Sequence, residues 1–137
     1  MRNRAALGLS AFLTGAGITH VVNPGFYDPM VPRVLPGSAR LWTYLSGAAE
    51  LAVAATVAYP RTRKTGGALA AGLFIAVFPG NLQMAWDWRE RSTPERAAAY
   101  GRLPLQIPLV VWGLRVRAGS VALDGRHARQ EPEQCVS

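Results

Sequence analysis

The sequence predicts an all-α integral membrane protein, a four-transmembrane-helix up-down bundle with a Pro-rich interfacial loop after the first helix. Three observations support this fold class. Charged residues make up 17% of the chain and gather in short islands. Long, nearly uncharged stretches separate these islands, at about residues 5–22, 41–60, 65–86 and 97–114. These stretches lack the single apolar stripe that a helix on the surface of a soluble domain shows.

The first stretch, residues 5–22, carries no formal charge. A helix rises about 1.5 Å per residue, so this stretch reaches about 27 Å, close to the hydrocarbon thickness of roughly 30 Å. Arg2 and Arg4 before an apolar run also resemble the start of a secretory signal. The run is longer than the apolar part of most signals and three more apolar stretches follow, so we expect a retained helix.

The next segment, residues 23–37, contains four prolines and is too apolar for a freely solvated loop. Proline fixes φ and removes a hydrogen-bond donor, and aromatic rings favour the head-group region. We expect an ordered, non-helical cap at the outer membrane interface. It is either a passive interfacial loop or a lid over a substrate site.

The second and third stretches are the most apolar. Residues 41–60 contain only one charged side chain, Glu50, and residues 65–86 contain none. Residues 68–79 are apolar on every side, which leaves no face for water. A soluble domain of 137 residues cannot bury four such helices, so a membrane must cover them.

The fourth stretch, residues 97–114, has Arg102 as its only charge. We therefore expect a membrane domain over residues 1–117 and a polar, disordered cytoplasmic tail over residues 118–137. The single cysteine, Cys135, lies in that tail. The chain has no CxxC pair for thiol exchange and no zinc spacing, so no metal site is expected.

Lysine and arginine counts predict the orientation. The side with the N-terminus, the 61–64 loop and the tail carries nine, and the other side carries six. Both termini are therefore expected in the cytoplasm. The net charge of +7 suits basic loops on an anionic leaflet, and no basic patch interleaved with aromatic residues indicates a nucleic-acid partner.

Ionisable and amide side chains inside the spans are the candidate site, because such groups are costly at membrane depth. Up-down connectivity brings five of them toward the outer half of the bundle, where we expect them to converge on one outward-facing, half-buried pocket. The candidate catalytic residues are Glu50 and His20, and the candidate ligand-binding residues are Asn81, Arg102 and Gln106. Three of them also have structural interpretations: His20 as a helix cap, Asn81 as a partner for carbonyls freed at Pro79, and Arg102 as a side chain that reaches lipid phosphates.

A series of short motifs resembles the DoxX-like family of small bacterial membrane proteins. The resemblance covers residues 8 to about 116 and rests on the order of Gly17-x-x-His20, Asn23-Pro24, Val31-Pro32 with Leu35-Pro36, Ser46-Gly47-x-x-Glu50, Pro60-Arg-Thr-Arg63, Phe78-Pro-Gly-Asn81 and Arg102-Leu-Pro-Leu-Gln106. It implies a four-helix bundle in the bacterial cytoplasmic (inner) membrane and an association with membrane redox chemistry. The membrane part has no cysteine pair, so dithiol oxidation by this chain alone is not expected.

Three functions fit these observations. The first is a redox-associated subunit that binds a quinone or similar apolar head group. A membrane or peripheral redox partner, or a bound cofactor, would supply the electrons. As an enzyme, the chain would be an oxidoreductase subunit without its own metal or dithiol. The second is a non-catalytic subunit or assembly factor, in which the polar cluster locks helix packing. The third, a small carrier or proton path through Glu50, requires a homo-oligomer to leave room for alternating access.

Overall fold

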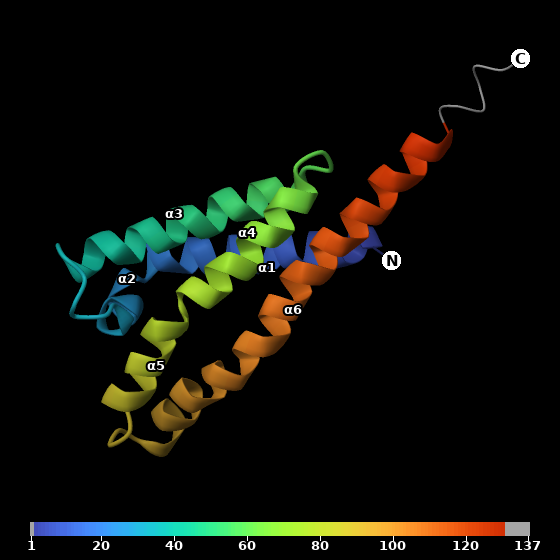
Figure 1. The fold of residues 1–137 in the computed structure, drawn as a ribbon. Helices are drawn as coiled ribbons and strands as arrows, with labels where there is room; N and C mark the ends of the chain where they lie inside the picture. Colours follow the sequence, from blue (N-terminus) through green and yellow to red (C-terminus); the bar gives the residue numbers. More distant parts are fainter. Residues whose placement is uncertain (1, 131–137) are drawn as a thin grey trace, which may run out of the picture.

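The computed structural model describes residues 2–130, and these residues form helices and turns without a strand (Figure 1). This confirms the all-α prediction. In order, the elements are α1 (Arg2–Val22), α2 (Pro24–Tyr27), the 3₁₀ turn η1 (Asp28–Met30), α3 (Ala39–Ala58), α4 (Arg63–Ala76), α5 (Phe78–Asp87) and α6 (Thr93–Gln130).

Three helical stretches are long and apolar enough to cross a membrane: Asn3–Val22, Ala39–Ala58 and Arg63–Asp87. Only 22–28% of the most apolar part of each is buried inside the chain, so most of their apolar surface faces outward. A membrane location is therefore plausible. The stretch over residues 97–114 is not among the three, because Arg102, Gln106 and two prolines interrupt its apolar run.

The helices pack as antiparallel neighbours. α1 lies along α3, α3 turns back into α4, and α4 lies along α6. Both described ends of the chain lie toward one end of the molecule, and α2 and the α5–α6 turn lie toward the other (Figure 1). The core between the helices includes Leu9, Leu13, Val57 and Phe74.

Glycines bring α4 and α6 into backbone contact. A Cβ atom added to Gly67 would lie 2.6 Å from the Arg117 nitrogen, and one added to Gly113 would lie 2.8 Å from the Ala71 nitrogen. No side chain fits at these positions without moving a helix. Small residues at helix crossings allow this close approach between helices in membranes.

The third expected helix is divided into two. α4 ends at Ala76 and α5 begins at Phe78, with Pro79 in its first turn. Proline lacks the N–H that would bond the carbonyl four residues earlier, and its ring clashes with that carbonyl, so a continuous helix breaks here. The predicted stretch over residues 65–86 corresponds to the apolar stretch Arg63–Asp87, and the interruption lies at the proline where freed carbonyls were expected.

The segment after α1 is ordered, but the expectation that it is non-helical was wrong. Pro24 and Pro29 lie in the first turns of α2 and η1. Proline suits a first helical turn because no intrahelical acceptor awaits its missing N–H and its φ is already helical. We call residues 23–37 the cap. The Trp42 indole holds its far end by donating to the Pro36 carbonyl at 2.7 Å.

The end of the chain also differs from expectation. A polar, disordered tail was predicted from Ala118, but α6 continues to Gln130 and extends past the other helices (Figure 1). No proline occurs between Pro108 and Pro132, and alanine, leucine and arginine in this part favour a helix. Cys135 and the rest of residues 131–137 lie outside the described residues.

Candidate functional site

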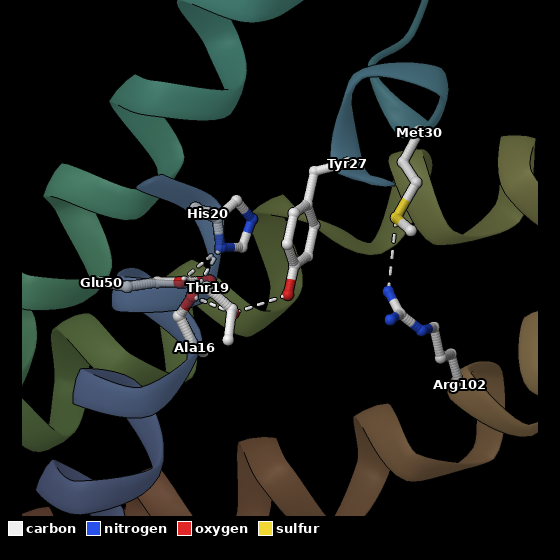
Figure 2. A network of polar contacts seen from close by, with 7 residues as sticks. All are labelled: Ala16, Thr19, His20, Tyr27, Met30, Glu50 and Arg102. Atoms are coloured by element: carbon white, nitrogen blue, oxygen red, sulfur yellow. Dashed lines mark hydrogen bonds and ion pairs between the residues drawn. The ribbon is translucent and has the colours of Figure 1, made fainter. Parts of the chain in front are cut away.

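A histidine and a glutamate from two different spans meet inside the bundle. His20 lies in the last turn of α1 and Glu50 in the middle of α3, and their Nδ1 and Oε2 atoms are 3.1 Å apart (Figure 2). The two side chains are only 11% and 12% exposed. The sequence pointed to both residues, and the structure places them in direct contact.

The Nδ1 atom of His20 has two oxygen neighbours at this contact. His20 Nδ1 also lies 2.8 Å from the Ala16 carbonyl oxygen. A single N–H can point at only one of these two acceptors. Directed at Ala16, it leaves the buried Glu50 Oε2 without a hydrogen-bond partner among the described residues. Glu50 therefore has an oxygen atom able to accept a proton or a donor group.

Two glycines allow this meeting. A Cβ atom on Gly47 would lie 2.8 Å from the His20 Cβ, and one on Gly17 would lie 2.9 Å from the Gly47 carbonyl oxygen. Gly17 lies three residues before His20 in α1, and Gly47 lies three residues before Glu50 in α3. This spacing places each glycine on the same helix face as the polar residue that follows it. The backbones of α1 and α3 thus approach closely where the pair forms.

Tyr27 covers the histidine ring. The two rings stack with centroids 3.7 Å apart and planes 20° from parallel, and the Tyr27 hydroxyl lies 2.7 Å from the Thr19 hydroxyl (Figure 2). From the sequence, Tyr27 was expected only to be one of the aromatic rings of residues 23–37. No local pattern reveals this contact, because it depends on α2 folding back over the end of α1.

Arg102 contacts the cap and not the His20–Glu50 pair. Its Nη1 lies 3.3 Å from the Met30 sulfur, and its guanidinium carbon lies 5.6 Å from the Phe26 ring centroid. Figure 2 shows Arg102 reaching from α6 to Met30. A cation over an aromatic face is attractive, so Arg102 ties the cap to α6.

Asn81 and Gln106 form a third group. Asn81 Nδ2 donates to Gln106 Oε1 at 2.8 Å, and Gln106 Nε2 donates to the Phe74 carbonyl. Phe74 lies in the last turn of α4, where helix carbonyls lack an intrahelical donor. These amides stabilise the break between α4 and α5, so the five predicted residues form three groups and not one pocket.

A hollow lies away from these three groups, between the cap and the end of α5. Its volume is about 570 Å³, and none of the five predicted residues lines it. Asp28 lies in its wall and binds the Thr43 hydroxyl and the Arg40 guanidinium, each at 2.8 Å. Burial acts to raise the pKa of Asp28, but these two donors outweigh it and hold the pKa below its ordinary value.

A protein-family model described as a domain of unknown function, DUF8561, matches residues 9–117. The chain belongs to the DUF8561 family. No curated protein and no solved structure matches it. The part that matches the DUF8561 model holds all three groups of polar residues and the cap. Among the residues of this DUF8561 protein that the structure describes, no three His, Cys, Asp or Glu side chains form a group able to hold a metal ion.

Proposed function

We propose that this DUF8561 protein is a membrane subunit that binds an apolar molecule with a polar, quinone-type head group at the His20–Glu50 pair. In this proposal the pair exchanges protons with the head group, and a redox partner supplies electrons. The chain spans the bacterial inner membrane four times, with both termini in the cytoplasm. The resemblance of its ordered motifs to the DoxX-like family supports the redox association.

The four-span topology draws support from the packing. α6 lies against α4 in an antiparallel arrangement, and the described ends of the chain lie toward the same end of the molecule. The excess of basic residues at that end favours the cytoplasm. With this orientation, His20 and the cap lie toward the outer face.

The observation that carries the proposal is a buried carboxyl oxygen beside an imidazole. Glu50 Oε2 lies 3.1 Å from His20 Nδ1 and has no hydrogen-bond partner among the described residues. A titratable group that is buried at membrane depth and incompletely bonded suggests a site, because a purely structural carboxyl would be fully paired. Imidazole and carboxylate together can accept a proton and return it.

A quinone head group takes up two electrons and two protons on reduction. Glu50 and His20 are placed to supply or accept those protons. Asn81 and Gln106, which we expected at the ligand, are bound to each other and to Phe74, so in this proposal they position α5 and α6. Arg102 holds the cap over the site.

Tyr27 shows how a flat ring fits against this pair. Its ring stacks on His20 with the two ring centroids 3.7 Å apart. A planar head group could stack on the same face of His20 at a similar distance. For a ligand to occupy this face, the Tyr27 ring must leave it, by rotation of its side chain or by movement of α2. In the second case, access to the pair depends on the contacts that Arg102 makes with Met30 and Phe26.

A binding titration tests this proposal. The purified full chain is titrated in micelles with a benzoquinone and a naphthoquinone that carry short isoprenoid tails, and binding is followed by tryptophan fluorescence. We expect saturable binding that is lost in Glu50→Gln. Glu90→Gln is the matched control, because Glu90 has a side chain that is 84% exposed. Absence of saturable binding to the wild-type protein would refute the proposal.

The contacts of Asn81 and Gln106 favour a second candidate, a non-catalytic subunit or assembly factor. In this function the polar groups lock the helices and the cap contacts a partner protein. It predicts that Glu50→Gln lowers the melting temperature while no quinone binds to either protein. The same titration, combined with thermal unfolding of both proteins, separates the two functions.

A further inference from the structure

The hollow between the cap and the end of α5 carries charges that the His20–Glu50 site does not use. Its lining includes Asp28 and Arg33 from the cap, and Asp87 and Arg91 from the end of α5 and the turn after it. Asp28 forms an ion pair with Arg40, and Arg91 forms one with Glu95 at 3.3 Å. Among the described residues, Arg33 and Asp87 form no ion pair, either with each other or with another side chain.

The hollow also lies at the level where the apolar helices end. Trp42, which is partly exposed, lies in the first turn of the apolar stretch Ala39–Ala58, and the stretch Arg63–Asp87 ends at Asp87 in the hollow. Tryptophan at the ends of membrane helices lies among the lipid head groups. Val31 and Leu35 add apolar surface to the same wall. A molecule in this hollow would have its polar part among the head groups and its apolar part beside the helices.

We propose that this hollow binds the head group of a zwitterionic phospholipid, one that carries a phosphate and a primary ammonium group. Arg33 contacts the phosphate, since guanidinium is a strong donor to phosphate oxygens. Asp87 accepts from the ammonium. One bound molecule thereby neutralises both unpaired charges, which a simple anion or cation does not do.

The aromatic side chains decide between a primary and a quaternary ammonium. A quaternary ammonium has no N–H to donate and binds best over an open aromatic face. The Arg91 guanidinium already lies over the Trp88 ring, 4.7 Å from its centroid. The Asp87 carboxylate in the same lining can accept a hydrogen bond, which only an ammonium with an N–H can donate. A primary ammonium with Asp87 is therefore the better match. This inference depends on the membrane location but not on quinone binding.

Native mass spectrometry of the full chain tests it. The protein is released from micelles that contain equal amounts of phosphoethanolamine, phosphocholine and phosphoglycerol lipids with the same acyl chains. We expect the ethanolamine lipid to be retained at least about threefold above the other two. Asp87→Asn should remove this preference, and Arg33→Gln should weaken retention of all three lipids by roughly three- to tenfold.

The matched controls, Arg89 and Glu90, lie in the turn after α5 and do not line the hollow. Arg89→Gln and Glu90→Gln change one cation and one carboxylate that pair with each other at 3.6 Å, and both should retain lipids as the wild type does. All four substituted side chains belong to exposed residues, so folding should be retained and circular dichroism checks this. Equal retention of the three lipids by the wild type, or an unchanged preference in Asp87→Asn, would overturn the proposal. Full competition by soluble glycerophosphoethanolamine would contradict a lipid as the ligand.

Discussion

At the scale of single residues, Gly47 allows a histidine and a glutamate to meet between two apolar helices. Glu50 could be predicted from the sequence as a site residue, because a carboxyl in mid-span has no interface within easy reach. His20 was predicted from its place near the end of α1. Tyr27 could not be predicted, because its stacking on His20 comes from the fold of the cap and not from spacing along the chain.

Gly47→Ala should destabilise the protein. The added Cβ would lie 2.8 Å from the His20 Cβ, so α1 must move away from α3. Overpacking of this kind costs about 1–3 kcal/mol, and thermal unfolding in micelles followed by circular dichroism measures it. Gly72→Ala is the control, because a Cβ there meets no atom within 4 Å. Equal melting temperatures for the two variants would argue against close packing at Gly47.

Asp28 should make the stability of the cap depend on pH. Burial acts to raise its pKa, but Thr43 and Arg40 together hold that pKa below the ordinary value of 3.8. A depressed pKa in the folded state stabilises the fold fully above the unfolded value, and this contribution is lost as the pH falls through the lower folded value. Asp28→Asn should remove this acid dependence, which melting curves between neutral and acidic pH can follow. Identical pH profiles for the two proteins would contradict the assignment.

At the scale of elements, the sequence located the helices better than their interruptions. The stretch at residues 41–60, with Glu50 as its only charge, became α3, Ala39–Ala58, because Ser38 caps its start and Pro60 follows its end. A disruption at Pro79 was expected from the proline, but a full division at Val77 was not, because Phe78-Pro79-Gly80 lies within an unbroken apolar run. The length of α6 was missed because polarity after Arg117 suggested disorder, although its residues favour a helix.

Gln106→Leu should destabilise the junction of α4, α5 and α6. The substitution leaves the Phe74 carbonyl and the Asn81 amide without their partner, and a buried polar group left unpaired costs about 1–3 kcal/mol. Gln83→Leu is the control, because Gln83 makes no side-chain hydrogen bond to the described residues. Hydrogen exchange at residues 77–81 should increase in Gln106→Leu and not in Gln83→Leu. If exchange is the same in both variants, Gln106 does not stabilise the break.

At the scale of the whole molecule, both described ends of the chain lie toward one end (Figure 1). Up-down connectivity was the reason to expect the five polar residues near one another. It did not predict that the five polar residues form three groups. That arrangement depends on the α4–α5 break, which turns Asn81 toward Gln106, and on the cap, which draws Arg102 to Met30. Neither contact follows from the order of residues within one helix.

Cysteine labelling tests the proposed topology. In a Cys135→Ser background, Val34→Cys places a thiol at a cap position that is 90% exposed, and Arg61→Cys places one in the turn between α3 and α4. A membrane-impermeant maleimide should label Val34→Cys in intact spheroplasts and Arg61→Cys only after permeabilisation. Labelling of Arg61→Cys in intact spheroplasts would reverse the proposed orientation.

Native mass spectrometry with solvent extraction, on gently solubilised wild-type, Glu50→Gln and Glu90→Gln proteins, tests the proposed function most directly. The account predicts a quinone at about one per chain in the wild type and in Glu90→Gln, and its loss in Glu50→Gln. A wild-type protein that carries no quinone, also after incubation with an excess of it, would contradict a binding site at His20 and Glu50.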